Sequence, residues 1–172
     1  MTSPYPISLE ISGAAGSRIF TSDGKDYIDF VSGVAVSALG HQHPAILSAV
    51  KEQLEKHLHV MVYGEFAQDC QNRLANKLNE ITPPSIDQFY LTNSGTEANE
   101  AAIKLVKRVT GRTEIVSLHG SYHGSTNGSL SISGNEPRKS AFRPLLPDVR
   151  FITLNDIADL KNITERTAGV FI

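Results

Sequence analysis

An apolar run passes through a turn of small residues into a strong helix in the stretch Tyr90-Leu91-Thr92-Asn93-Ser94-Gly95-Thr96-Glu97-Ala98-Asn99-Glu100-Ala101-Ala102-Ile103-Lys104. This pattern predicts a strand over residues 86–91 and a helix over 96–109. Ser94, followed three residues later by Glu97, fits a capping box, which satisfies N–H groups at a helix start. The apolar stripe predicted for the helix consists of Ala98, Ala101, Ala102, Leu105, Val106 and Val109.

Strand patterns alternate with helix patterns after this stretch. Further strands are expected over residues 114–118, 149–154 and 168–172, and a short helix over 156–163 with Asn155 as its cap. Residues 135–147 contain three prolines and fit a long surface connection. The alternation predicts an α/β fold with a mainly parallel sheet flanked by helices.

Residues 1–60 have a different pattern, and we assign them to a separate amino-terminal segment. Two short strand patterns, residues 18–20 and 27–30, flank Asp23-Gly24-Lys25-Asp26 and predict a hairpin. A loop over 31–40 follows, and Pro44 then opens a helix. Residues 61–172 form the second predicted domain, which begins with a helix over 65–80.

Composition and charge exclude several classes of protein. The chain has 172 residues, of which 40% are hydrophobic and 20% charged, as in a globular protein. Its 16 Lys and Arg against 18 Asp and Glu give a net charge of −2, which does not favour nucleic-acid binding. No apolar run is long enough to span a membrane, and the first residues lack the pattern of a signal peptide. A single cysteine, Cys70, fits a reducing compartment, so we expect a cytoplasmic protein.

The start of the helix after Ser94 is also a candidate anion site. Gly95 permits close approach of a ligand, and the first N–H groups of a helix converge on its N-terminus. The hydroxyls of Ser94 and Thr96 add possible donors. The sequence has neither a G-x-x-x-x-G-K-[ST] nor a G-x-G-x-x-G pattern, so a bound phosphate need not belong to a nucleotide. The structural interpretation, a capped crossover helix without a ligand, stays open at this point.

A second candidate segment, His119-Gly120-Ser121-Tyr122-His123-Gly124-Ser125, follows directly after the strand predicted over 114–118. Its two glycines allow a tight bend, and Tyr122 offers a flat face to an aromatic ligand. Alone, the Tyr-His pair fits ordinary loop packing. Beside an anion-binding helix start, it suits a small phosphorylated heteroaromatic ring.

Several ordered motifs together resemble the class-III branch of the pyridoxal-phosphate aminotransferases (fold type I). They are Asn93-Ser94-Gly95-Thr96-Glu97-Ala98, Ser121-Tyr122-His123-Gly124, Asp23-Gly24-Lys25-Asp26-Tyr27-Ile28-Asp29-Phe30, Ser32-Gly33 and Gly40-His41-Gln42-His43-Pro44. The resemblance runs from about Gly16 to the last residue. It implies that residues 61–172 are the first part of a large cofactor-binding domain, incomplete at Ile172.

The resemblance also implies roles for individual residues. Ser94, Gly95 and Thr96 would hold the phosphate of pyridoxal 5′-phosphate, Tyr122 would stack on its ring, and His123 would lie nearby. Val34 would line the substrate pocket. The resemblance places Val34 where ornithine-specific relatives carry a Tyr, so Val34 favours acetylornithine or 4-aminobutyrate as the amino donor.

The activity implied for the intact protein is transfer of an amino group from such a donor to a 2-oxo acid such as 2-oxoglutarate, in a homodimer. Family members carry the Schiff-base Lys and the Asp that contacts the pyridine nitrogen further along a longer chain. None of Lys104, Lys107, Lys139 or Lys161 matches that lysine. We therefore expect the chain to be the amino-terminal part of a transaminase, inactive alone and with no catalytic residue of its own.

Three other interpretations remain. The chain could be a non-catalytic module that binds a phosphorylated ligand, or part of an ornithine-type aminotransferase. The pairs His41-x-His43 and His57-x-His59 invite a metal hypothesis, but no cysteine or carboxylate cluster completes a site, so we expect no metal. Cys70 lies on the apolar side of its predicted helix and is expected to act as a small buried hydrophobe.

Overall fold

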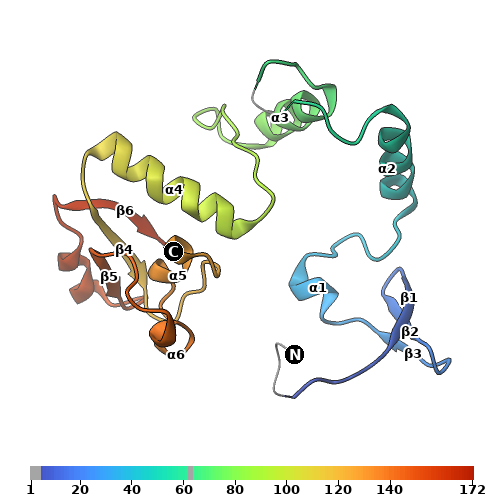
Figure 1. The fold of residues 1–172 in the computed structure, drawn as a ribbon, viewed down its shortest axis with the longest axis horizontal. Helices are drawn as coiled ribbons and strands as arrows, with labels where there is room; N and C mark the ends of the chain where they lie inside the picture. Colours follow the sequence, from blue (N-terminus) through green and yellow to red (C-terminus); the bar gives the residue numbers. More distant parts are fainter. Residues whose placement is uncertain (1–4, 62–63) are drawn as a thin grey trace. The chain divides into compact units, whose positions relative to one another are not determined.

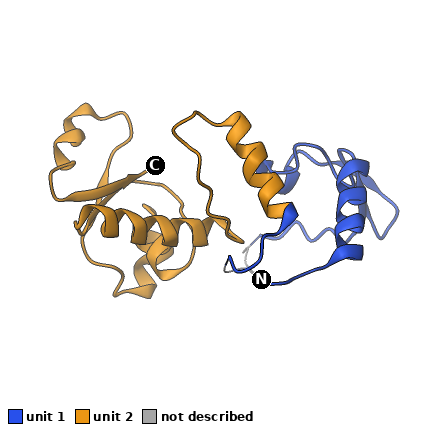
Figure 2. Cartoon of the chain, turned by 90° about the horizontal axis from the view of Figure 1, so that it is seen from above, with its two compact units in different colours: residues 1–69 blue, residues 70–172 orange. Residues whose placement is uncertain are grey.

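The computed structural model describes residues 5–61 and 64–172. The chain divides into two compact units, Met1–Asp69 and Cys70–Ile172 (Figure 2). Each unit is described by itself below. The division into domains at residues 60 and 61 stays a prediction.

The first unit contains a three-stranded antiparallel sheet with the order β1-β2-β3 (Figure 1). Its strands are β1, Ile11–Ala15, β2, Arg18–Thr21, and β3, Asp26–Ile28. The turn between β2 and β3 is closed by Thr21, whose N–H donates to the carbonyl of Lys25 at 2.9 Å. The hairpin predicted from Asp23-Gly24-Lys25-Asp26 is therefore confirmed, whereas β1 was not predicted.

Three helices follow the hairpin. The short helix α1, Ser32–Ala35, lies within the predicted loop, and α2, Pro44–Lys56, begins at the proline as expected. The third, α3, is Asp69–Ile81, so the prediction of a helix from residue 65 was wrong. Residues 65–68 are not helical, and the side chain of Gln68 instead donates to the carbonyl of Met61 at 2.6 Å.

The second unit is built on a parallel sheet with the order β5-β4-β6. The strands are β4, Glu114–Leu118, β5, Val149–Ile152, and β6, Thr167–Phe171. Two helices, α4, Gly95–Thr110, and α5, Asn127–Ile132, pack against it. The core joins these layers through Ile103, Ile115 and Ile132, with Leu146, Val149 and Phe171 at its margin. The predicted α/β class is confirmed.

The strand predicted over residues 86–91 was wrong. This segment is outside any strand and forms no strand pairing with a described residue of the chain. A strand is defined by its ladder of hydrogen bonds to a neighbour, and β4 already has β5 and β6 on its two sides. The segment is apolar, but no strand of the described residues pairs with it.

The connection over residues 135–147 is more ordered than predicted. It contains α6, Glu136–Lys139, and a 3₁₀ helix, Ser140–Phe142. Lys139 is only 3% exposed, and its ammonium group donates to the carbonyls of Ser133 at 2.8 Å and Ser131 at 3.4 Å. Describing the whole segment as a surface loop was therefore wrong.

The helix predicted over residues 156–163 is a 3₁₀ helix, Ile157–Asn162. Its cap is Asp156, whose carboxylate accepts the N–H of Ala158 at 2.9 Å, and not Asn155. Asn155 has a φ of 64°, so it belongs to the preceding turn.

The face of α4 that packs on the sheet also differs from the predicted stripe. Ile103 is buried, and Val106 contacts β6, where a Cβ at Gly169 would lie 3.1 Å from its side chain. Leu105 and Val109 are exposed. The outer face of α4 borders an open groove of about 830 Å³ whose apolar lining includes Tyr90, Leu91, Ala98, Ala101, Ala102 and Leu105. Beside Ile103 and Val106, the inward face of α4 also carries Asn99 and Glu100, which bond to the loop before α5 and to the start of α5.

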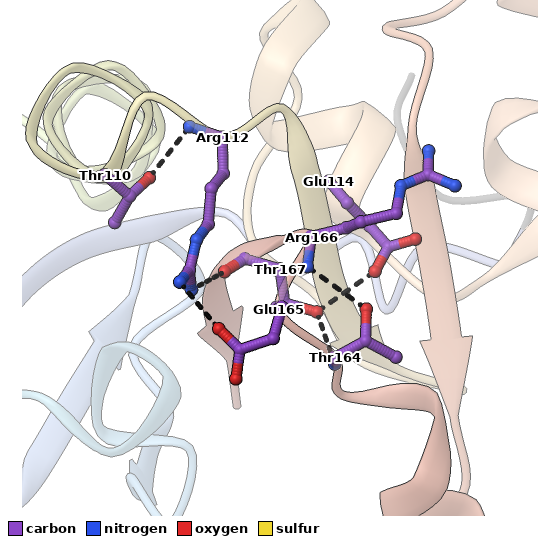
Figure 3. Close-up of polar contacts among 7 residues, drawn as sticks. All are labelled: Thr110, Arg112, Glu114, Thr164, Glu165, Arg166 and Thr167. Atoms are coloured by element: carbon purple, nitrogen blue, oxygen red, sulfur yellow. Dashed lines mark hydrogen bonds and ion pairs between the residues drawn. The ribbon is translucent and has the colours of Figure 1, made fainter.

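Polar side chains tie together the amino ends of β4 and β6 (Figure 3). Arg112 donates to the carbonyl of Thr167 at 3.1 Å and to the carboxylate of Glu165 at 3.0 Å. The buried Glu114 accepts the hydroxyl of Thr167 at 3.0 Å and the guanidinium of Arg150 at 3.1 Å. The charged and polar side chains named here are thus hydrogen-bonded to partners within the chain.

Candidate functional site

The candidate site begins at the N-terminus of α4. Ser94 has extended backbone angles and is the N-cap, as predicted. Its hydroxyl accepts the N–H of Glu97 at 3.3 Å, while the carboxylate of Glu97 accepts the hydroxyl of Ser94 and the N–H of Asn93, each at 2.9 Å. The capping box fixes the point where the chain enters the helix.

The N–H groups of Gly95 and Thr96 are left open by this cap. The first N–H groups of a helix have no partner within the helix. Within residues 5–61 and 64–172, neither of these two N–H groups donates a hydrogen bond. A Cβ built at Gly95 would meet no atom of the rest of the chain within 4 Å, so there is open space beside Gly95. The helix start presents donors and a partial positive charge to a free volume.

The second segment is a tight loop at the carboxyl end of β4. The hydroxyl of Ser121 donates to the carbonyl of Leu118 at 2.8 Å. The backbone carbonyl of Ser121 accepts the N–H of Gly134 at 2.9 Å. A Cβ at Gly134 would lie 2.1 Å from the carbonyl oxygen of Leu118. The two chain segments can approach this closely only because residue 134 has no side chain.

This loop is packed directly against the first turns of α4. The side chain of Asn99 donates to the carbonyl of His123 at 2.7 Å. A Cβ at Gly124, where φ is 129°, would lie 2.3 Å from the hydroxyl oxygen of Thr96. The two predicted segments, Ser94-Gly95-Thr96 and Tyr122-His123, are therefore brought together in one unit.

The ring of Tyr122 lies at the rim of a cavity of about 380 Å³. The side chain is largely exposed, its hydroxyl lies 3.2 Å from that of Ser125, and the guanidinium of Arg138 lies over the ring at 5.8 Å. The cavity is lined by the ends of the parallel strands and the segments after them, Leu118, His119, Gly120, Ser121, Tyr122, His123, Leu154 and Ile172. Open α/β sheets bind ligands at this edge.

The side chain of His123 is held in the loop by packing. Its Nε2 lies 3.2 Å from the hydroxyl of the buried Ser117, and its ring contacts Phe171 edge to face at 6.2 Å. Burial lowers the pKa of His123 below its ordinary value of 6.5, because a charged imidazole would lose hydration there. The position and protonation of this side chain are set by packing.

Sequence reasoning missed the residues that attach the loop to α4. Glu100 lies on the buried side of the helix and accepts the N–H groups of Gly128 at 2.8 Å and Ser129 at 3.1 Å, at the start of α5. The hydroxyl of Ser129 donates to the carbonyl of Thr96 at 2.9 Å. In the sequence, only the acidic character of Glu100, one helical turn after Thr96, could have indicated this contact.

The predicted substrate residue, Val34, belongs to the first unit, so its position relative to α4 is not described. It is exposed and has a φ of 65°, which is rare for a β-branched residue. The turn before it is held by Asp29, whose carboxylate accepts the N–H groups of Val31 at 3.0 Å and Ser32 at 2.9 Å. The roles assigned to Val34 and to the five residues of the second unit stay predictions.

The histidines of the first unit lie among structural contacts. His41 Nε2 lies 2.7 Å from the carboxylate of Asp29, and its backbone pairs with that of Gly16. In the described residues, no group of three or more His, Cys, Asp and Glu side chains could hold a metal ion. The contacts of His41 with Asp29 and Gly16 join the loop before Pro44 to the residues around the hairpin.

The whole chain matches a known family. The family model for class-III aminotransferases matches residues 2–170. The chain belongs to the class-III aminotransferase family. The resemblance seen in the motifs is thus confirmed along nearly the full sequence.

Relatives and solved structures agree with this assignment. Acetylornithine aminotransferase of Halalkalibacterium halodurans is 40% identical over 165 residues, which are 95% of this chain and 42% of that protein. The structure of adenosylmethionine-8-amino-7-oxononanoate aminotransferase from Methanocaldococcus jannaschii matches with a TM-score of 0.88 and 27% identity, over 99% of this chain and 44% of that one. Taurine:2-oxoglutarate aminotransferase from Bifidobacterium kashiwanohense, solved with PLP and glutamate, matches with a TM-score of 0.83 and 28% identity, over 99% and 44%.

The class-III chain thus spans less than half the length of the relatives it matches. Within the described residues, no helix combines the length and the apolar character needed to cross a membrane.

Proposed function

We propose that this chain supplies the phosphate-binding and ring-stacking part of a pyridoxal-phosphate site in a class-III transaminase. The observation that carries the proposal is the pair of open N–H groups of Gly95 and Thr96, beside free space and next to the Tyr122 loop. A phosphate monoester is an anion of the size that helix N-termini bind.

The residues at the site suit each part of this cofactor. The N–H groups at the start of α4 and the hydroxyl of Ser94 would bind the phosphate, for which the carboxylate of Glu97 would have to release that hydroxyl. Tyr122 would cover one face of the ring, and the neutral His123 would support the loop beneath it. When bound, pyridoxal phosphate supplies a pyridine ring that takes up electrons from the donor's Cα bonds.

The substrates of the whole protein are the finer part of the proposal. Relatives of the acetylornithine aminotransferase type support an acylated or omega-amino donor and a 2-oxo acid acceptor such as 2-oxoglutarate. The apolar Val34 in the predicted substrate loop fits acetylornithine or 4-aminobutyrate better than ornithine. By family resemblance, we propose a cytoplasmic homodimer.

The 172-residue chain alone is proposed to be inactive. Lys139 is buried and its pKa is lowered, chiefly by burial, which in other sites makes a lysine reactive. Its ammonium group, however, donates to two carbonyls and lies 4.0 Å from the centre of the Phe151 ring. Lys104 lies on the exposed face of α4. Amino-donor-dependent turnover by the purified chain would contradict this part of the proposal.

Binding of pyridoxine 5′-phosphate tests the proposal directly. This analogue has an alcohol in place of the aldehyde and cannot bond covalently to surface lysines. We expect saturable binding by calorimetry, and much weaker binding of pyridoxine, which lacks the phosphate. Gly95→Ala places a methyl group in the open space and should weaken binding by about tenfold or more. Gly13→Ala in β1 is the matched control, since its Cβ would make only an ordinary contact at 3.7 Å.

Equal affinity for the two compounds would contradict the phosphate site and favour a module of another kind. Unchanged binding by Gly95→Ala would place the ligand elsewhere on the chain.

A further inference from the structure

Glu100 occupies a position from which one carboxylate oxygen reaches three donors of another element. It follows Thr96 by one helical turn, on the face of α4 that packs against α5. Its Oε1 accepts the hydroxyl of Thr126 at 2.5 Å and the N–H groups of Gly128 and Ser129 at 2.8 and 3.1 Å. A Cβ at Gly128 would lie 2.2 Å from Glu100, so this close approach depends on a glycine.

Glu100 is charged in this position. Burial alone would raise its pKa, but the hydrogen bonds from Thr126, Ser129 and Gly128 and the charge of Lys104 together hold the pKa below its ordinary value of 4.5. A charged carboxylate accepts hydrogen bonds and cannot donate one.

The charge of Glu100 fixes the direction of the neighbouring hydroxyl groups. Because the carboxylate only accepts, Thr126 must donate its hydroxyl proton to Glu100. The oxygen of Thr126 lies 2.8 Å from the hydroxyl oxygen of Thr96, so in that contact Thr96 is the donor. The N–H of Thr126 also points to the oxygen of Thr96, at 3.4 Å. The hydroxyl proton of Thr96 is therefore directed to Thr126 and is not free to bind a ligand.

We propose that Glu100 is a positioning residue for the phosphate site: through Thr126 and the start of α5 it holds the Tyr122 loop against α4 and turns the hydroxyl of Thr96 inward. The inference deepens the proposed function and rests on it. A ligand phosphate is then bound by the N–H groups of Gly95 and Thr96 and by Ser94, whereas the hydroxyl of Thr96 serves as a tie between α4 and the loop.

Hydrogen exchange of the unliganded 172-residue chain tests, without any cofactor, whether Glu100 holds the Tyr122 loop against α4. Glu100→Ala removes all three acceptor contacts, and we expect the amides of residues 121–129 to exchange roughly tenfold faster or more. Glu100→Gln keeps a carbonyl oxygen in place and should restore part of the protection. Glu165→Ala is the matched control, because Glu165 is exposed and pairs with Arg112 at the opposite edge of the sheet.

Substitution of Thr96 separates the two possible roles of its hydroxyl. Thr96→Val keeps the shape of the side chain and removes the proton, and Thr96→Ser keeps the proton. If the hydroxyl is a tie, Thr96→Val speeds exchange over residues 121–129 before any ligand is added, and Thr96→Ser does so far less. If the hydroxyl instead donates to the phosphate, Thr96→Val leaves exchange unchanged and only weakens binding of pyridoxine 5′-phosphate, which would overturn the inference.

Two further outcomes keep this inference distinct from the proposed function. Unchanged exchange in Glu100→Ala, with α4 intact by circular dichroism, would overturn the role of Glu100. Should Glu100→Ala fail to fold, Glu100→Gln and Thr96→Val decide the same question. Failure of the wild-type chain to bind pyridoxine 5′-phosphate would contradict the proposed function, while the exchange data would still decide whether Glu100 holds the loop.

Discussion

The two edges of the parallel sheet use polar groups in opposite ways. At the amino edge, the buried Glu114 and Thr167 bond to each other, and Arg112 closes the edge from outside (Figure 3). At the carboxyl edge, the N–H groups of Gly95 and Thr96 face open space, and Tyr122 is largely exposed. A saturated edge contributes stability, while an edge with free donors is available to a ligand. Substitution of the saturated polar groups should therefore change stability alone, whereas Gly95→Ala at the open helix start should change binding alone.

The largest effect is expected at the carboxyl edge, where two chain segments touch without a side chain between them. Gly134→Ala places a Cβ 2.1 Å from the carbonyl oxygen of Leu118 and should lower the free energy of unfolding by about 3 kcal/mol. Urea denaturation measures this change. Gly95→Ala is the control and should stay within about 0.5 kcal/mol of wild type, since its Cβ meets no atom. Equal stability of the two variants would show that the loop packing is looser than described.

The amino edge should respond in stability alone. Glu114→Ala leaves the hydroxyl of Thr167 without its acceptor and removes the buried partner of Arg150, at a cost of about 2 kcal/mol. Urea denaturation and calorimetry with pyridoxine 5′-phosphate are both needed. If the free energy of binding pyridoxine 5′-phosphate falls in Glu114→Ala as much as the free energy of unfolding does, the amino edge does not act on stability alone.

Ser94 is both the N-cap of α4 and a proposed phosphate ligand, so its substitution should change both the stability and the binding affinity. Ser94→Ala removes the N-cap and should lower the free energy of unfolding by about 1 kcal/mol. It also removes a hydroxyl donor from the proposed phosphate site, and binding should weaken. Ser94→Thr, which keeps a capping hydroxyl, should recover most of the stability. A variant that loses stability but binds normally would assign Ser94 to the cap only.

The smallest effect is a pH dependence at His123. Because burial depresses its folded pKa below the ordinary 6.5, the unfolded chain takes up a proton at higher pH than the folded chain does. The stability contribution is therefore complete above the unfolded value and is lost as the pH falls through the folded pKa. Unfolding free energies measured between pH 7.5 and 5 should decline in wild type and decline less in His123→Gln. Parallel curves would assign the dependence to another group.

Local patterns predicted many elements of the fold correctly. The capping box joins Ser94 to Glu97 across three residues, Pro44 starts α2, and the runs of β4, β5 and β6 are short and apolar. Such features depend on neighbours in sequence, so they can be read without knowing the fold. The pairing of Ser94-Gly95-Thr96 with the Tyr122 loop followed from the motifs, and both segments lie in one unit.

Other features could not be read from local patterns. The segment 86–91 is apolar, yet it has no partner strand among the described residues. Lys139 looked like a surface residue in a loop rich in proline, but it is buried with two carbonyl acceptors. Leu105 and Val109 of α4 are exposed, whereas Ile103 is buried and Glu100 bonds to the start of α5.

The sequence by itself determined the alternation of strands and helices, the cap of α4 and the family. Only the tertiary structure decided that Asn99 and Glu100, rather than the alanines beside them, bond to the Tyr122 loop and the start of α5. These contacts join residues 24 to 30 positions apart, from Asn99 to His123 and from Thr96 to Thr126. A contact across such a distance forms only when packing of the sheet has closed the intervening chain, and short-range patterns do not encode that closure.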